Sequence, residues 1–355
     1  MYGYMGEEWL EFTTPSKKFF EKNSKNLLTN TYLYDIIVLL IGQMCPTINK
    51  LKRGLRQRSQ KGETPMNHFM ILDCETATLP KASEYGNEEK KKRVAIAKPL
   101  IYDLGWTIID ENGNIIKKVN FLIAEIFSVP SIFDTAYFKD KRTIYLEKLQ
   151  KGEIMLTPWV MATAEFENDL KTVACVGASN SMFDFKKAIP FTELYISKLY
   201  APDFHEWLNE QHRICDWIAE GGKMRNEKAH DFEKNVFRYR GGEYDLFDVW
   251  GLACKHLINC DEYKMMCLQN QWKTKSGKYF ITNAEKVFAF LSQDLEFAES
   301  HTAIDDCIIE GVIFAEIHKK TCGNWEKGII YFPFRELGTV AEFCQRMGIE
   351  NPFAD

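Results

Sequence analysis

The chain has 355 residues, of which 45% are hydrophobic and 27% charged, and its formal net charge at pH 7 is −5. This composition excludes a wholly disordered polymer and allows one large domain, with or without an appendage. The weak negative charge neither requires nor excludes a nucleic-acid partner, because metal ions can neutralise a cluster of acids. Ten scattered cysteines without a signal-peptide pattern indicate a reducing cytosol rather than a secreted disulfide framework, so we expect a cytoplasmic protein.

Residues 1–66 differ from the rest and are predicted to form an accessory extension. The segment 13–26 is polar and rich in lysine. The apolar run 36–41 is too short to cross a bilayer, which takes about 20 residues, so we expect a buried or docking helix and no membrane partner. The run 50–61 has basic residues and no acid, which indicates a solvated linker or, alternatively, a basic arm that contacts phosphates.

Strand signals begin immediately after this extension. Residues 69–73 are a short apolar run, which predicts a fully buried strand. Further strands are predicted over 102–109 and 115–124. The junction between them, 110–114, reads Asp-Glu-Asn-Gly-Asn and predicts a hairpin turn, because Asn and Gly tolerate positive φ. A charged loop over 81–98 separates the first two strands.

Strand and helix signals then alternate. Residues 173–177 predict another buried strand, and 246–249 predict a shorter one that leads into a helical run over 250–268. Helices that start at capping residues are predicted over 283–291 and 302–319.

This order of elements predicts an α/β fold with a mixed sheet flanked by helices. The main domain is expected over 67–320. Within it, 185–242 has no readable motif and is expected to be a helical insertion, and 321–355 is expected to be a C-terminal tail that packs on the domain.

One cluster of potential zinc ligands falls within the helical run: Cys254, His256, Cys260 and Cys267. It contains no Cys-x-x-Cys pair, which structural zinc sites usually have. Packing of these side chains in the core is therefore the favoured interpretation.

Three separated motifs contain acids at predicted element ends. In the first, Asp73 and Glu75 are two residues apart on a strand, so both carboxylates leave the same face while Cys74 points into packing. The apolar residues before Asp73 place the acids at the carboxyl end of the strand, where open sheets bind ligands. A solvated pair of acids at a turn is the plainer explanation of this motif taken alone.

In the second motif, Asp184 follows Asn180 by four residues, just past a predicted strand. Ser181 is a candidate cap for the helix that contains Asp184, and Asn180 is a candidate to orient the backbone or neighbouring acids. A capping Asn and a first-turn Asp that favours the helix dipole explain the motif equally well.

The third motif opens the last long helix. Thr302 is a good N-cap, and Asp305 three residues later matches a capping box, which leaves Asp306 free. His301 precedes the helix on a loop, where it is suited to accept a proton from water. Helical periodicity alone does not choose between Asp305 and Asp306, and His301 could equally be a plain surface residue.

Together the motifs provide what two-metal phosphodiester hydrolysis requires. Two divalent ions about 3.5–4 Å apart offset the charge of the phosphate and lower the pKa of bound water. Such ions are hard and prefer carboxylate oxygens. We expect Asp73 to bridge both ions, with Glu75, Asp184 and Asp306 as further ligands, and His301 to deprotonate the attacking water.

The order Asp-x-Glu, Asn-x-x-x-Asp and His-x-x-x-x-Asp resembles the DEDDh exonucleases of the ribonuclease H-like fold, over about residues 67–320. The resemblance implies a mixed five-stranded sheet, two Mg²⁺ or Mn²⁺ ions, and 3′→5′ removal of nucleotides from a nucleic acid with a 3′ end. It selects Asp306 over Asp305, and it implies that Thr76 and Ala77 line the pocket for the 3′-terminal nucleotide. Asn180 is expected to support substrate binding.

Other functions stay open from the sequence. The chain could be a catalytically idle nuclease-fold protein that binds nucleic acid, a polymerase or another replication protein. It could also act on short oligonucleotides if the segment 185–242 narrows the cleft. The sequence does not choose DNA or RNA, because one contact to the 2′-hydroxyl decides it.

Overall fold

The computed structural model describes residues 67–79, 99–219 and 235–353. The predicted extension 1–66 and the predicted loop 81–98 lie outside these residues, so the sequence predictions made for them stay predictions. Among the described helices, none is both long enough and apolar enough to span a membrane.

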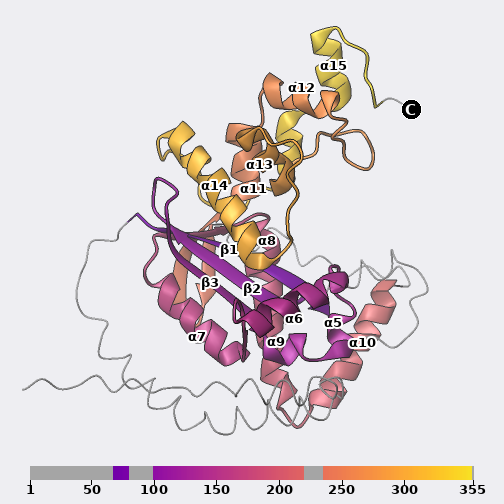
Figure 1. Cartoon of the computed structure of the whole chain (residues 1–355). Helices are drawn as coiled ribbons and strands as arrows, with labels where there is room; N and C mark the ends of the chain where they lie inside the picture. Colours follow the sequence, from indigo (N-terminus) through magenta and orange to yellow (C-terminus); the bar gives the residue numbers. More distant parts are fainter. Residues whose placement is uncertain (1–66, 80–98, 220–234, 354–355) are drawn as a thin grey trace, which may run out of the picture. The chain divides into compact units, whose positions relative to one another are not determined.

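The described strands form one seven-stranded sheet in the order β4-β3-β2-β1-β5-β7-β6 (Figure 1). β1, β5 and β7 are mutually parallel, as are β3 and β4, whereas β2 is antiparallel to β1 and β3, and β6 to β7. The predicted α/β class with a mixed sheet is therefore confirmed, with short strands at both edges beyond the five expected. The strands are β1 Phe69–Thr78, β2 Pro99–Ile109, β3 Ile115–Ile123, β4 Met155–Thr157, β5 Cys175–Ala178, β6 Val236–Tyr239 and β7 Gly242–Asp248.

The predicted hairpin joins β2 and β3, and its turn is built by side chain and backbone together. The Oδ1 atom of Asp110 accepts hydrogen bonds from the backbone N–H groups of Asn112 (2.9 Å) and Asn114 (2.8 Å). Gly113 has a φ of 82°, which a residue without a Cβ adopts at little cost. The turn chemistry read from the sequence therefore fixes this register.

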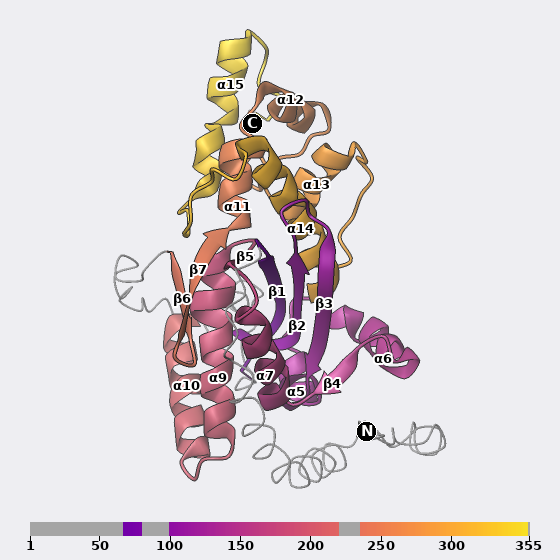
Figure 2. The ribbon, with the colours of Figure 1, turned by 90° about the vertical axis from the view of Figure 1, so that its left-hand side faces the viewer.

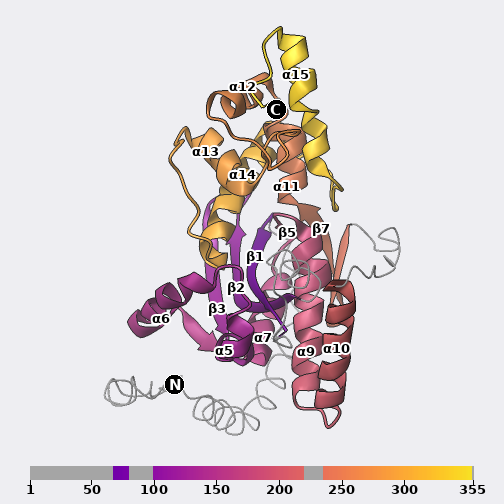
Figure 3. The same cartoon turned by 90° about the vertical axis from the view of Figure 1, so that its right-hand side faces the viewer.

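Helices cover both faces of the sheet (Figures 2 and 3). Two of them, α9 and α10, lie side by side within the expected insertion 185–242, which also contains strand β6. The helices are α4 Ala124–Phe127, α5 Pro130–Phe133, α6 Arg142–Lys151, α7 Trp159–Leu170, α8 Ser181–Phe183, α9 Ile189–Leu199, α10 Phe204–Ala219, α11 Val249–Leu252, α12 Asp261–Gln269, α13 Ala284–Ser292, α14 Ala303–Thr321 and α15 Val340–Met347. Shorter helical turns are η1 Lys139–Lys141, η2 Asp184–Ala188, η3 Ala253–Leu257 and η4 Pro333–Leu337.

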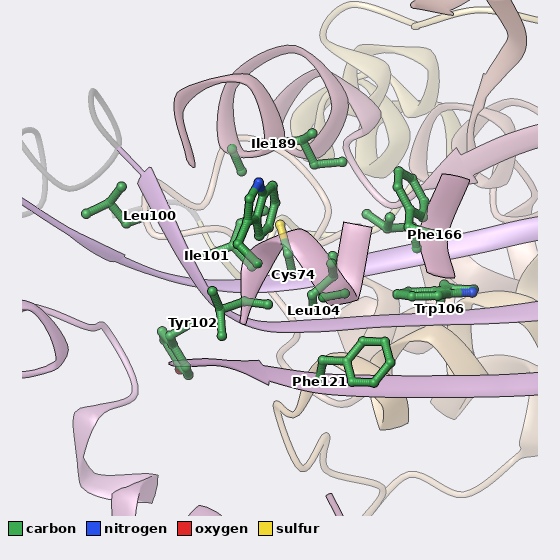
Figure 4. Packing of buried hydrophobic residues seen from close by; sticks show 14 of the residues in the cluster. Cys74, Leu100, Ile101, Tyr102, Leu104, Trp106, Phe121, Phe166 and Ile189 are labelled. Carbon is green, nitrogen blue, oxygen red and sulfur yellow. The ribbon is translucent and has the colours of Figure 1, made fainter. Parts of the chain in front are cut away.

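One face of the sheet packs against α7 and α9. Alternate side chains of β1, from Met70 to Cys74, join Phe166 of α7 and Ile189 of α9 in a single apolar core (Figure 4). Because strand side chains alternate in direction, the residues between them must leave the opposite face.

The opposite face packs against α14. Phe69 and Ile71 of β1 contact a second core that includes Phe314 of α14. Phe343 of α15 and Phe353 are buried in the same core, so the C-terminal tail packs on this side of the sheet. The alternation along β1 therefore directs Asp73 and Glu75 toward α14.

Candidate active site

Three carboxylates from two elements meet between the sheet and α14. Asp73 and Glu75 of β1 and Asp306 of α14 each offer an oxygen, and these oxygens all lie within 4.8 Å of one another. We call Asp73, Glu75 and Asp306 the acid cluster. The first and third motifs, more than 200 residues apart in the sequence, thus meet in the structure.

The acid cluster is electrostatically costly without a positive partner. Burial, followed by the charges of Asp73 and Asp103, raises the pKa of Glu75 to about 10. Burial, and then the charges of Asp73 and Glu299, raise the pKa of Asp306 to about 9. The pKa of Asp73 is likewise well above its usual range, through burial and then the charge of Asp184.

The donor set fits a hard divalent cation. All the candidate ligand atoms are carboxylate oxygens, which Mg²⁺ and Mn²⁺ prefer. The Oδ1 atom of Asp306 is buried and has no hydrogen-bond partner, which is the state of an oxygen that is built to receive a ligand. The site therefore supports divalent-metal binding.

Asp184 lies next to the acid cluster but not within it. Asp184 is 2% exposed, and its Oδ1 accepts a hydrogen bond from the Cys74 thiol at 2.9 Å. Burial raises the pKa of Asp184 to about 7, and its charge in turn raises the pKa of Asp73, so the two side chains are neighbours. Cys74 thus packs away from the acid cluster, as predicted, and also holds the acid of the second motif.

His301 is likewise outside the acid cluster. Its ring stacks on Phe138, with ring centroids 4.3 Å apart and planes 14° apart, and its Nδ1 is 3.5 Å from Oε2 of Glu299. His301, Glu299 and Glu285 form a second group whose ligand atoms lie within 4.8 Å of one another. Burial and then the charge of Lys141 lower the pKa of His301, which favours the neutral ring that a general base requires.

The position of α14 is fixed by a carboxylate that the sequence analysis did not single out. Asp103 on β2 is fully buried, and its Oδ2 accepts hydrogen bonds from the backbone N–H of Ala303 (3.0 Å) and the hydroxyl of Tyr145 (2.8 Å). Gly105, two residues along, allows close approach, because a Cβ there would lie 2.7 Å from backbone atoms of Ala303 and Ile304. The start of α14 is thus anchored directly on β2.

The predicted capping box at this helix is not formed. The Thr302 hydroxyl donates to Oδ2 of Asp305 at 2.7 Å instead of accepting from a backbone N–H. Asp305 also accepts from the Ser300 hydroxyl at 2.7 Å and pairs with Lys148, so its carboxylate is engaged on the surface. Asp306, and not Asp305, therefore meets Asp73 and Glu75 in the acid cluster.

The loop after β5 is tied to both the sheet and α14. Asn180 has the left-handed φ of 63°, and its backbone N–H donates to Oδ1 of Asp248 at 3.3 Å. Ser181 does not cap a helix through its side chain; its hydroxyl is buried and donates to the carbonyl of Phe247 at 2.5 Å. Glu310 of α14 accepts from the backbone N–H of Ser179 at 2.9 Å and so joins the second and third motifs.

The predicted contacts to the terminal nucleotide lie at the end of β1. Thr76 is half-buried, whereas Ala77 is 1% exposed and packs in the α7 and α9 core. A register shift in the β1–β2 pairing between Glu75 and Thr76 accounts for this, because it changes which side chains face α14. The substrate roles of Thr76, Ala77 and Asn180 stay predictions.

The possible zinc ligands do not converge on a common metal position. Two of them are buried in the core that includes Phe314 of α14. Cys254 and Cys267 are buried among apolar side chains, and Nε2 of His256 lies 3.1 Å from Oε2 of Glu326. Among the described residues, the groups that could hold a metal are the acid cluster and the Glu285, Glu299, His301 group.

Several residues near the site were not predicted from the sequence. Glu310 lies one helical turn after Asp306, so spacing alone could have placed it on the same face. Asp103 interrupts an otherwise apolar strand, which is an equally readable signal. Lys141 had no such signal: its Nζ donates to the carbonyl of Ser300, and its charge acts on Glu75 and Asp306.

No protein-family model matches the chain, and no curated protein sequence matches it. Solved structures are similar at low identity. A cell-death related nuclease 4 (CRN-4) is 10% identical with a TM-score of 0.33, over 72% of this chain and 64% of that chain, so this chain spans less than two thirds of its length.

A structure described as 3′-end specific recognition of histone mRNA stem-loop by 3′-exonuclease is 10% identical with a TM-score of 0.33, covering 88% of this chain and 89% of that chain. The Mg²⁺ and Mn²⁺ bound form of S. pombe Pop2p is 15% identical with a TM-score of 0.36, covering 85% of this chain and 96% of that chain. Likeness at this level is weak and carries no conclusion about activity.

Proposed function

We propose that this chain is a metal-dependent 3′→5′ exonuclease that hydrolyses single-stranded DNA or RNA and releases nucleoside monophosphates. The observation that supports it most is the convergence of Asp73, Glu75 and Asp306 within 4.8 Å, with a buried, unpartnered oxygen on Asp306. Strongly raised pKa values caused by burial and like charges are typical of functional sites.

The residues have distinct roles in this proposal. Asp73, Glu75 and Asp306, with Asp184 beside them, hold two Mg²⁺ or Mn²⁺ ions. When bound, these ions offset the phosphate charge and lower the pKa of a bound water. His301, whose ring stacks on Phe138 in the structure, accepts the proton of the attacking water.

The proposal extends to a substrate and a compartment. A nucleic acid with a free 3′ end is the partner, and Lys141, whose charge acts on Glu75 and Asp306, provides a positive group near the site. The eight cysteines whose side chains the structure describes are all free thiols, which suits the reducing cytosol that we propose. A polymerase or replication partner stays a prediction from the sequence.

The direct test is a degradation ladder on matched single-stranded DNA and RNA, labelled at the 3′ end or the 5′ end. With Mg²⁺ or Mn²⁺, 5′-labelled strands should shorten stepwise while 3′-labelled strands release labelled mononucleotide at once. Asp73→Ala should abolish this activity and retain single-strand binding. Undiminished Mg²⁺-dependent hydrolysis by Asp73→Ala would falsify the assignment.

A further inference from the structure

A cavity of about 490 Å³ opens directly beside the acid cluster. Its lining combines carboxylates with two aromatic rings: Asp73, Glu299, Asp306 and Glu310, together with Trp250 and Phe334. Pockets for small organic ligands have volumes of roughly 300 to 1,000 Å³, so this cavity is large enough for a nucleoside. Trp250 and Phe334 come from the loop-and-helix region after β7, outside the three motifs.

The aromatic wall, Trp250 and Phe334, is held in place by contacts of its own. The Nε1 of Trp250 donates a hydrogen bond to Oγ1 of the buried Thr282 at 2.9 Å, which fixes the indole plane. The ring of Phe334 packs edge-on against Tyr279, with ring centroids 4.9 Å apart. Both rings are only half-buried while they line the cavity, so they offer apolar surface to a ligand.

The lining of the cavity also includes uncharged polar groups. Asn283 lines it and is exposed, and its side chain does not cap α13 although it occupies the N-cap position. Thr274 lines it as well, with its hydroxyl donating to the carbonyl of Tyr279 at 2.9 Å. An amide and a hydroxyl next to aromatic surface are suited to the edges and sugar of a nucleoside.

The two kinds of lining residue together restrict the ligand. The carboxylates repel an anion unless cations lie between them, and the aromatic rings offer no ligand atoms to a bare ion. A flat apolar ring joined to a phosphate suits both the aromatic rings and metal-bound carboxylates. Stacking on aromatic side chains accepts every base, because every base has a π-face.

We propose that this cavity is the binding site for the base of the 3′-terminal nucleotide, which stacks on Trp250 and Phe334 while its phosphate lies at the acid cluster. This inference rests on the proposed exonuclease function. It places the base on the α14 side of the sheet, away from Ala77, which is buried in the opposite core.

The test compares two product-like ligands in the presence of Mg²⁺ by calorimetry. Adenosine 5′-monophosphate has the base and ribose 5-phosphate lacks it, so their affinity ratio measures the contribution of stacking. Base stacking on aromatic residues predicts a ratio of about 5- to 150-fold. Trp250→Leu and Phe334→Leu, which keep apolar volume but remove the ring, should each reduce this ratio at least threefold.

The matched control is Phe332→Leu. Phe332 is two residues from Phe334 and 58% exposed, and it does not line the cavity, so this variant should keep the full ratio. Thermal unfolding confirms that each variant is folded. Equal affinities for the two ligands in the unaltered protein, or an unchanged ratio in both cavity variants, overturn the base site.

Failure of this inference is distinguishable from failure of the proposed function. A protein that shortens labelled strands from the 3′ end but binds both ligands equally lacks the base site and remains an exonuclease. A protein that shows the affinity ratio and its loss in the variants, but releases no nucleotide with any divalent ion, keeps the base site and is not an exonuclease.

Discussion

At the scale of single residues, the acid cluster shows how neighbouring carboxylates differ in role. Asp305 and Asp306 are adjacent, yet Asp305 is hydrogen-bonded to Ser300 and Thr302 on the surface while Asp306 leaves one oxygen unpartnered in the interior. The direction of the side chain from the helix, rather than residue type, makes the difference.

Asp305 and Asp306 provide a matched test of the metal site. Asp306→Asn removes a ligand charge and should reduce kcat at least about 100-fold, because metal-borne charge stabilisation amounts to several kcal/mol. Asp305→Asn should retain activity within about threefold, since exposed pairs contribute little. The measurement is single-turnover hydrolysis of a 5′-labelled strand. A larger loss of activity in Asp305→Asn than in Asp306→Asn would contradict the assignment of Asp306 as the metal ligand.

Protonation of the acid cluster gives a pH-dependent prediction. Glu75 and Asp306 have folded pKa values of about 10 and about 9, above their unfolded values of 4.5 and 3.8. The folded state therefore binds more protons, and stability falls as pH rises from 3.8 to about 10. Metal binding needs the deprotonated groups, so the stabilisation by Mg²⁺ should grow over the same range. We expect the Tm gain on adding Mg²⁺ to be larger at pH 8 than at pH 6. A gain that is equal or smaller at pH 8 contradicts this.

At the scale of elements, the site depends on how closely α14 approaches β2. The backbone of Ala303 donates to Asp103, and Gly105 leaves no side chain between strand and helix. Glu310 then connects the same helix to the loop after β5 through Ser179. The distance between the second and third motifs is thus set by contacts outside the motifs themselves.

A methyl group at Gly105 should displace the helix. A Cβ there meets the backbone of α14 at 2.7 Å, so Gly105→Ala should cost roughly 1–3 kcal/mol in unfolding free energy and reduce activity. Gly311→Ala on the same helix is the control: its Cβ has ordinary contacts at 3.8 Å or more, and Ala favours a helix over Gly by about 1 kcal/mol. Urea unfolding of both variants checks this, and a stable, fully active Gly105→Ala protein is the contrary outcome.

Much of this arrangement could be predicted from the sequence where the signal is local. Alternation along β1 placed Asp73 and Glu75 on one face, and the Asp110 turn gave the hairpin register. The orientation of His301 was not predictable, because it depends on stacking with Phe138, more than 160 residues away. The Cys74 to Asp184 hydrogen bond is long-range in the same way, and edge strand β4 is too short for a periodic pattern.

At the scale of the whole molecule, the residues that the structure describes include every residue that the proposed chemistry uses. The acid cluster, Asp184 and His301 all lie between residues 73 and 306, and Phe343 of α15 is buried in the core that α14 shares. The basic run 50–61, which the sequence favours as a linker or a phosphate-contacting arm, has no part in that chemistry.

Removal of residues 1–66 should therefore affect binding more than catalysis. The single-turnover rate at saturating substrate should stay within about twofold. If the basic run contacts phosphates, the affinity for a single strand should weaken and the slope of log affinity against log salt should become shallower. The full-length chain is the reference in both assays, and a large drop in the saturating rate would contradict the expectation.

The hydrogen bonds of Asp103 have a practical consequence. One side chain joins β2, Tyr145 of α6 and the first residue of α14, and its Oδ1 also accepts from Asn120 of β3 at 2.5 Å. A genetic screen for lost activity will therefore recover position 103 as readily as a metal ligand, although this carboxylate is enclosed by protein donors. Only the yield of folded protein will separate the two kinds of hit.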